Sequence, residues 1–64
     1  MLPLNDREQK IIELVCNGKS DGETAQIIGV SRSTVRQQLR LAYAKLDAHN
    51  RAEACAHFMK RLRP

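Results

Sequence analysis

The chain has 64 residues, with 11 Lys and Arg against 7 Asp and Glu, a net charge of +4 and a pI of about 9.6. This length predicts one small domain over residues 1–64, too short for most enzyme folds, whose pockets need walls from more than one layer. No apolar run approaches the roughly 18 residues of a membrane span, and the charged N-terminus does not resemble a signal peptide. Two cysteines do not make a disulfide-rich secreted scaffold, so we expect a cytoplasmic domain with reduced thiols.

Basic residues are concentrated in the second half of the chain. Residues 1–30 carry three basic and five acidic side chains, whereas residues 31–64 carry eight basic and only two acidic ones. A basic half of this kind is the electrostatic footprint of a protein that binds a polyanion. Charge alone does not identify the partner, because many solvated surfaces are basic. The spacing of residues within this half is therefore more informative about the partner.

The spacing of apolar residues predicts an all-α fold, a four-helix bundle that contains a helix-turn-helix. The predicted helices cover residues 6–17, 21–28, 32–46 and 51–62. Capping-box spacings precede three of them: Asn5 with Glu8, Ser20 with Glu23, and Asn50 with Glu53. Gly18 and Gly29 follow the first two helices, where glycine commonly ends a helix. No segment alternates with a period of two residues, so no strand is expected.

The second and third predicted helices have the spacing of a helix-turn-helix. A small residue at Ala25 lets two helices approach closely, and Gly29 can adopt the left-handed conformation that reverses the chain. The serine that follows the turn, Ser31, is a good cap for the third helix. A plain helical hairpin inside a small bundle is the alternative interpretation. The apolar stripe that would face the core on the third helix is Val35, Leu39, Ala42 and Leu46.

The opposite face of the third predicted helix is basic and polar. Arg36 and Arg40 are four residues apart and therefore share a face. Arginine can bind guanine O6 and N7 as a fork, and glutamine can pair with adenine, so we predict base contacts by Arg36, Gln37 and Arg40. Hydroxyls and amides at a helix N-terminus suit phosphate. We therefore predict DNA backbone contacts from Ser31, Ser33 and Thr34, and assign the neighbouring Arg32 to the backbone as well. A solvated basic face is the alternative.

Several short motifs follow one another along the chain, and their combination is specific. They are Leu4, Arg7 and Glu8; Gly18–Lys19–Ser20; Glu23 and Ala25; Ile28–Gly29–Val30–Ser31; Thr34–Val35–Arg36; Lys45–Leu46; and Asn50 through Ala54. Over about residues 4–59 the chain resembles the DNA-binding domain of the LuxR family of bacterial transcription regulators, the GerE-type helix-turn-helix. The stretch 42–56 is most similar to the quorum-sensing branch. The resemblance implies an inverted-repeat site bound by a dimer, with the third helix in the major groove. It also implies base contacts at Arg36, Gln37 and Arg40 and backbone contacts at Thr34 and Gln38.

Three positions depart from the family pattern. Thr24 stands where an aliphatic residue is usual, Gln38 replaces a common histidine, and Asp47 replaces a frequent glycine. These departures concern affinity and site sequence rather than the class of protein. Most members also carry an N-terminal sensor domain, so we expect this chain to be either an excised C-terminal domain or a stand-alone regulator.

The fourth predicted helix carries two neighbouring apolar stripes. Cys55, Phe58 and Leu62 form one, and Ala52, Ala56 and Met59 form the other. Since one stripe can pack on the first helix, we predict that Ala52, Ala56 and Met59 form the interface of a weak homodimer that is stabilised on DNA. The alternative is that both stripes are covered within the monomer or stay partly exposed, as single apolar residues often do.

No catalytic residue, cofactor or metal site is predicted. His49 is expected in an exposed loop and His57 on the outer side of its helix, while Cys16 and Cys55 are interpreted as core thiols. The favoured function is sequence-specific binding of double-stranded DNA, as the DNA-binding domain of a bacterial transcription regulator. The alternative is a protein-interaction module with the same fold and little DNA specificity, such as an antagonist or a domain like sigma region four that contacts RNA polymerase.

Overall fold

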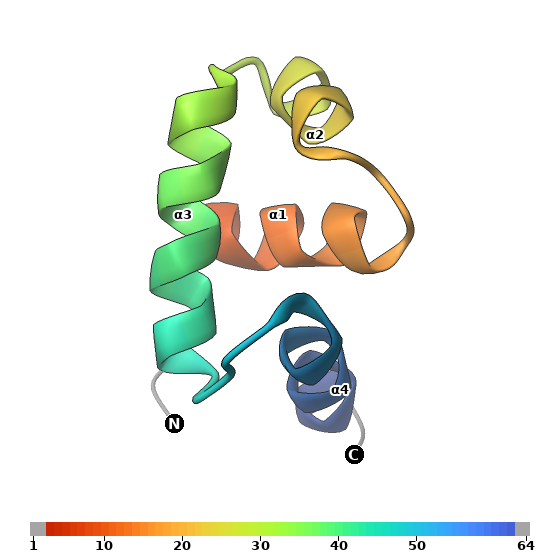
Figure 1. Ribbon diagram of the computed structural model, residues 1–64, viewed down its shortest axis with the longest axis vertical. Coiled ribbons are helices and arrows are strands. Elements are labelled where there is room, and N and C mark those ends of the chain that lie inside the picture. Colours follow the sequence, from red (N-terminus) through yellow and green to blue (C-terminus); the bar gives the residue numbers. More distant parts are fainter. Residues whose placement is uncertain (1–2, 63–64) are drawn as a thin grey trace.

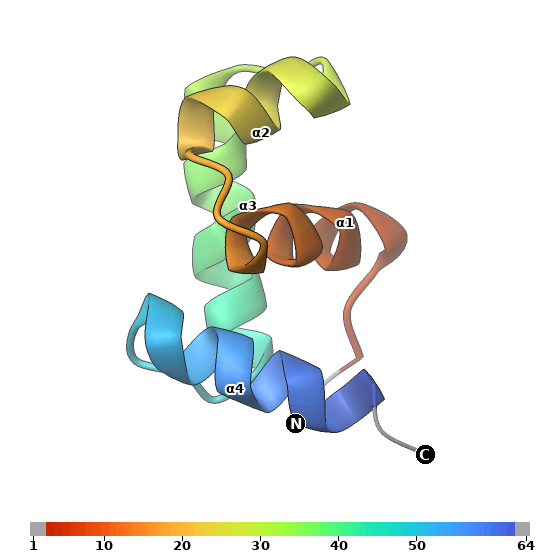
Figure 2. The ribbon, with the colours of Figure 1, turned by 90° about the vertical axis from the view of Figure 1, so that its right-hand side faces the viewer.

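The computed structural model describes residues 3–62, with the side chains of residues 3–61, and this part of the chain contains four helices and no strand. The helices are α1 (Asp6–Cys16), α2 (Asp21–Ile28), α3 (Arg32–Lys45) and α4 (Arg51–Leu62). Figure 1 shows that α3, the longest helix, runs along one side while α2, α1 and α4 lie across it one below another. Figure 2 shows the same three helices as successive levels in front of α3. The all-α prediction is confirmed. Two helices end one residue before the predicted position, α1 at Cys16 and α3 at Lys45.

Side chains cap the helix N-termini much as the sequence predicts. Both reciprocal bonds of the capping box are present before α1 and before α2. At α4, Asn50 Oδ1 accepts the Glu53 N–H at 2.8 Å, but Glu53 Oε1 accepts the N–H of His49, at 2.7 Å, rather than that of Asn50. The third box therefore closes one residue earlier than predicted. These bonds satisfy amide groups that have no partner inside their own helix.

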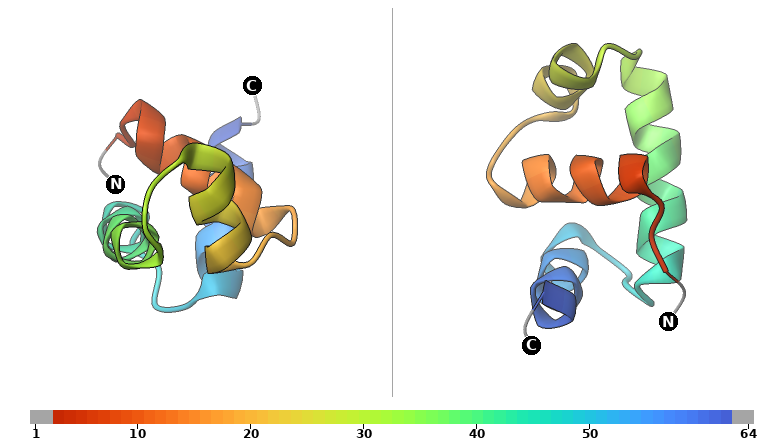
Figure 3. Two further views of the ribbon diagram at one scale, coloured as in Figure 1. Left: turned by 90° about the horizontal axis from the view of Figure 1, so that it is seen from above. Right: turned by 180° about the vertical axis from the view of Figure 1, so that it is seen from behind.

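The core lies between α1 and α3, with α2 packed on both of these helices and α4 packed on α1. α1 makes extensive contact with α3 and also packs against both α2 and α4, so it is the central level seen from behind in Figure 3. The predicted inward stripe of α3 is buried along its whole length. Apolar burial of this kind is the main favourable term for so small a domain. The buried apolar residues are Ile11, Ile12, Val15, Ala25, Val35, Leu39, Ala42, Leu46, Ala54 and Phe58.

The turn between α2 and α3 has the geometry of a helix-turn-helix. Gly29 has φ +84°, a left-handed conformation that side chains disfavour, and it directly follows the last residue of α2. The N–H groups of Gly29 and Val30 both donate to the carbonyl of Ala25, at 2.8 and 3.0 Å. Ala25 and Val35 are both buried, as expected if α2 packs directly on α3. The predicted roles of Ala25, Gly29 and Val35 are confirmed.

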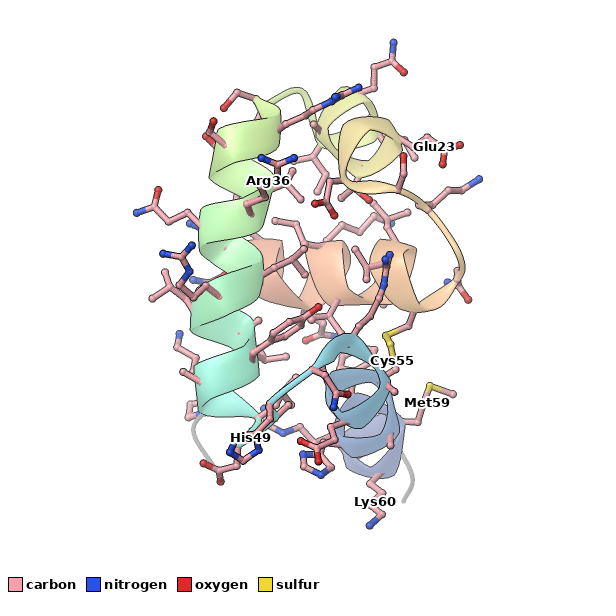
Figure 4. All side chains as sticks on the ribbon, viewed as in Figure 1. Glu23, Arg36, His49, Cys55, Met59 and Lys60 are labelled. Carbon is pink, nitrogen blue, oxygen red and sulfur yellow. A yellow bond between two sulfur atoms is a disulfide. The ribbon has the colours of Figure 1, made fainter. Side chains whose placement is uncertain are left out.

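The prediction of two reduced core thiols is wrong. Cys16, the last residue of α1, forms a disulfide with Cys55 of α4, and their Cα atoms are 5.6 Å apart. Both cysteines are only half-buried. The bond joins two segments separated by 39 positions in sequence, and helical spacing says nothing about which faces of two distant helices meet. α4 is thus covalently attached to α1 (Figure 4).

Two arginines of α4 donate hydrogen bonds to carbonyl groups at or just beyond the C-terminal ends of α1 and α3. Arg51 Nη2 donates to the carbonyl oxygens of Lys19 and Val15, at 2.9 and 3.3 Å, just beyond and within the last turn of α1. Arg61 Nη2 donates to the carbonyl oxygen of Lys45, at 3.1 Å, at the end of α3. Cations are favoured at helix C-termini because the peptide dipoles leave negative partial charge there. Some of the positive charge in the second half of the chain therefore stabilises the fold.

The prediction that His57 lies on the outer side of α4 is also wrong. Its side chain is half-buried, and Nδ1 lies 2.7 Å from the carbonyl oxygen of Leu46, so Nδ1 carries the hydrogen and donates. His49 is exposed in the segment before α4, as predicted (Figure 4). Both histidines thus form hydrogen bonds at the junction between α3 and α4. Across residues 3–62, no helix is long and apolar enough to span a membrane.

Candidate nucleic-acid interface

The first half of α3 presents the basic and polar face that the sequence predicts. The apolar stripe holds one side of the helix in the core, and this orientation turns the other side to solvent. Arg36, Gln37 and Arg40, the predicted base-contacting residues, are all exposed. Arg32 and Ser33 are exposed at the beginning of the same helix. The structure therefore brings these side chains onto one helix, where each of them is exposed to solvent.

Ser31 and Thr34 are engaged in the first turn of α3. Ser31 Oγ accepts the N–H of Thr34 at 3.1 Å and lies 3.0 Å from Thr34 Oγ1. These bonds fix the N-terminus of the helix, as expected for a serine cap. Each hydroxyl oxygen retains further hydrogen-bonding capacity for an outside group. Gln38 is half-buried, so of the predicted backbone-contacting residues it is, with Thr34, the less accessible.

Sequence reasoning missed an acidic residue beside the predicted reading face. Along α3 no acidic residue offsets the arginines, but Asp21 of α2 does so in space. Arg36 Nε lies 3.6 Å from Asp21 Oδ2, and the side chain of Arg36 remains 66% exposed while that of Asp21 is 33% exposed. In Figure 4, Arg36 lies on the side of α3 that faces α2. The helix-turn-helix packing brings the two residues together, and no local pattern indicates it.

A second arginine of α3 also lies against the start of α2. A β-carbon built on Gly22 would be 2.9 Å from Nε and from Nη2 of Arg32, so this guanidinium covers the glycine. The two helices and Arg51 of α4 enclose an open hollow of about 350 Å³. Its lining carries three guanidinium groups and one carboxylate. The lining residues are Ser20, Asp21, Gly22, Arg32, Arg36 and Arg51.

Two ionisable groups near this surface have displaced pKa values. Hydrogen bonds from the N–H and the hydroxyl of Ser20 lower the pKa of Glu23, so this capping carboxylate is charged at neutral pH. Burial raises the pKa of Tyr43 on α3, against the opposing charge of Arg51, so its phenol is neutral. The charges that an approaching polyanion meets on α3 are therefore those of the arginines.

A short helix, a tight turn through a left-handed glycine and a second helix with an exposed basic face define a helix-turn-helix DNA-binding domain. The chain belongs to the luxR family of bacterial regulatory proteins, whose GerE domain matches residues 2–58. This agrees with the resemblance that the motifs indicate and establishes the chain as a DNA-binding domain of the kind found in transcription regulators.

Several curated proteins are similar over most of this chain. The transcriptional regulatory protein DesR of Bacillus subtilis is 42% identical over 52 residues, 81% of this chain and 26% of DesR. The quorum sensing-dependent transcriptional regulator VjbR of Brucella melitensis is 42% identical over 53 residues, 83% of this chain and 20% of VjbR. The quorum-sensing regulator RhlR of Pseudomonas aeruginosa is 39% identical over 54 residues, 84% of this chain and 22% of RhlR. The chain thus spans about a quarter or less of these relatives. No solved structure was found to match it.

The predicted dimer face of α4 is accessible. Ala52, Ala56 and Met59 are all exposed, and Met59, at 55%, is one of the large apolar side chains most open to solvent. In Figure 4 Met59 points away from the other helices. On the inner side of α4, Ala54 and Phe58 are buried in the core. The inner side of α4 therefore completes the domain, while the face with Met59 is open to a partner.

Proposed function

We propose that this domain binds an inverted-repeat site in double-stranded DNA as a dimer, with the first half of α3 in the major groove. Arg36, Gln37 and Arg40 contact base edges, because their exposed side chains carry the donors and acceptors that distinguish base pairs. The observation that carries this proposal is the exposed basic face of α3 in a helix-turn-helix. The DNA backbone is contacted by Ser31, Arg32, Ser33, Thr34 and Gln38.

The basic residues differ in whether they are bonded within the fold or exposed on α3, and this difference supports the proposed role of α3. Arg51 and Arg61 bind carbonyl groups at the ends of other helices, and Lys45 binds a buried carboxylate of α1. The arginines at positions 32, 36 and 40 extend from α3 with exposed side chains. The helix that would enter the groove therefore offers three exposed positive charges to a polyanion. Such a regulator would act in the bacterial cytoplasm, where its DNA lies.

The experiment is selection from a random duplex library at about 0.15 M salt, where exposed charges are substantially screened. An enriched inverted repeat would support both base reading and the dimer. Arg36→Ala, Gln37→Ala and Arg40→Ala are then measured on the selected site and on a random duplex. Each base-contacting variant should lose roughly 1–3 kcal/mol on the selected site and relax the preference at one base pair.

Lys60→Ala is the matched control for lost positive charge, since Lys60 is exposed near the end of α4, far from the start of α3 (Figure 4). It should leave every base preference unchanged. If an α3 variant loses equal affinity on selected and random DNA, that residue contacts the backbone instead of a base. If folded protein enriches no sequence, the proposal fails, and the fold serves an interaction with a protein such as RNA polymerase.

The dimer is tested with Met59→Lys. A lysine at this position cannot be repelled by DNA, so a loss of affinity would not arise from charge against phosphate. We expect unchanged binding to a single half-site and loss of the joint occupancy of the two half-sites. Ile27→Lys makes the same change at another exposed apolar residue, 54% exposed on α2, and should retain joint occupancy. Equal behaviour of the two variants would refute α4 as the interface.

A further inference from the structure

We propose that Asp21 is a positioning residue that determines which edge of the Arg36 guanidinium faces the DNA, an inference that rests on the proposed reading role of α3. The two side chains come from the two helices of the helix-turn-helix. Asp21 is the first residue of α2, and Oδ2 of its carboxylate lies 3.6 Å from Nε of Arg36. The contact is with Nε, on the side of the guanidinium, and this determines which donors remain for a base.

A guanidinium has five N–H donors in a fixed planar fork. A carboxylate beside Nε occupies the edge that Nε shares with one terminal nitrogen, which leaves open the end of the guanidinium, where each terminal nitrogen offers one N–H. Guanine presents O6 and N7 as a pair of acceptors in the major groove, and a paired contact needs two donors held in one orientation. Asp21 thus favours a single presentation of a side chain that is 66% exposed and otherwise free to rotate.

The ion pair contributes little to the stability of the free domain, because exposed pairs are worth about 0–1 kcal/mol. Its effect should grow in the complex, since DNA excludes water from both charges and lowers the local dielectric constant. The position of Asp21 is fixed on the other side by α2, whose packing on α3 rests on the Gly29 turn. The Asp21 carboxylate is therefore held beside α3 by the packing of α2, and it restricts the orientation of the longer, more flexible Arg36 side chain.

The charge of Asp21 also has a second effect on DNA binding, opposite in sign to its effect on discrimination by Arg36. It is the only carboxylate among the six residues that line the hollow, where Arg32, Arg36 and Arg51 bring three positive charges. A carboxylate close to the phosphate backbone weakens sequence-independent binding. Removing its charge should therefore strengthen binding to random DNA while it weakens discrimination at the base pair that Arg36 reads. A residue that merely repels DNA would change both affinities in the same direction.

The test is Asp21→Asn, measured with the selected duplex, a random duplex and duplexes substituted at each base pair of the site. We expect affinity for random DNA to rise about twofold to fivefold from the lost negative charge. Discrimination at the Arg36 base pair should fall about threefold to tenfold, a part of the full Arg36 contribution. Asp6→Asn is the matched control, because Asp6 is likewise the first residue of a helix, α1, and the change in charge is identical. It should leave the discrimination unchanged.

A double-mutant cycle assigns the effect to the pair. In an Arg36→Ala background, Asp21→Asn should no longer change discrimination at any base pair. Without DNA, the Nε–H resonance of Arg36 should exchange faster with water in Asp21→Asn than in Asp6→Asn. Unchanged discrimination in Asp21→Asn, or the same loss in the Arg36→Ala background, overturns the role of Asp21 while the proposed function stands. If wild-type protein discriminates no base pair, the proposed function fails and this inference with it.

Discussion

Lys45, the last residue of α3, donates from Nζ to Oε1 of Glu8 in the first turn of α1, at 2.7 Å. Glu8 is 1% exposed, so this is a buried carboxylate in the interface between the two helices. Its Oε1 also accepts the N–H of Asn5, at 3.0 Å, to complete the capping box. The Glu8 side chain therefore both caps the N-terminus of α1 and joins this helix to the end of the proposed recognition helix.

Glu8→Gln is predicted to destabilise the domain in a pH-dependent manner. Burial raises the pKa of Glu8, but bonds from Lys45 and Asn5 outweigh it and hold the pKa below its ordinary value of 4.5. The carboxylate thus stabilises the folded state above that ordinary value, and this contribution disappears as the pH falls through the lowered pKa. Glutamine can still cap the helix, so the loss at pH 7 should be about 1–3 kcal/mol from the lost charge.

Urea unfolding between pH 3 and pH 7 measures this difference. The gap between wild type and Glu8→Gln should be widest at pH 7 and should narrow below pH 4.5. Glu23→Gln is the matched control, because Glu23 holds the same capping position in α2 but is exposed. It should lose less stability at pH 7. A pH-independent gap for Glu8→Gln would show that packing, and not the charge, accounts for the effect.

Reduction of the Cys16–Cys55 disulfide is predicted to lower the free energy of unfolding by about 2–4 kcal/mol. The bond closes a segment with a sequence separation of 39, and cross-linking such a loop restricts the unfolded chain. The midpoint of urea unfolding should fall when a dithiol reductant is added. The double variant Cys16→Ser with Cys55→Ser should match reduced wild type and be insensitive to reductant. Two reactive thiols in denatured, non-reduced protein would contradict the bond.

Local patterns predicted the helices and the exposed face of α3 because both depend on residues close together in sequence. Caps act over three residues, and the stripe from Val35 to Leu46 determines which side of α3 is buried. The same stripe placed Arg36, Gln37 and Arg40 in solvent. Exposure could thus be read from helical periodicity alone, without knowledge of the neighbouring helices.

What the sequence could not show are the pairings between helices. The Cys16–Cys55 bond, the Glu8–Lys45 bond and the Asp21–Arg36 pair each join side chains from different elements. The first two join positions 39 and 37 residues apart. Such contacts depend on how helices cross, and the periodicity of a single sequence carries no signal of that crossing. The acidic neighbour of the candidate site was missed for this reason.

Thr24→Val is predicted to stabilise the domain by about 1 kcal/mol. The Thr24 side chain is fully buried, and among the described residues its hydroxyl has no hydrogen-bond partner. Burying an unpaired hydroxyl costs free energy that a methyl group of similar shape does not. Thr34→Val is the matched control, because the Thr34 hydroxyl lies 3.0 Å from Ser31 Oγ. Thermal unfolding should show a higher Tm for the first variant only, and equal shifts would point to valine propensity instead.

Asp47→Gly is predicted to stabilise the end of the proposed recognition helix. Asp47 has φ +55°, the one positive φ of a residue other than glycine within residues 3–62. It follows the C-cap of α3, where its N–H donates to Ala44 and the N–H of Ala48 donates to Tyr43, the pattern of a Schellman motif. Glycine adopts this conformation without steric cost, so the backbone alone should raise the free energy of unfolding by about 0.5–1 kcal/mol, and the interaction that the Asp47 side chain makes opposes this gain.

Asp47→Ala separates the backbone effect from the loss of the side chain. Both variants remove the carboxylate, but alanine keeps the β-carbon that the left-handed conformation disfavours. We expect Asp47→Ala to be less stable than wild type by about 1 kcal/mol, whereas Asp47→Gly is more stable. Urea unfolding of the three proteins measures both signs. If glycine and alanine destabilise equally, interactions of the Asp47 side chain outweigh the backbone, and the aspartate is the better residue at this turn.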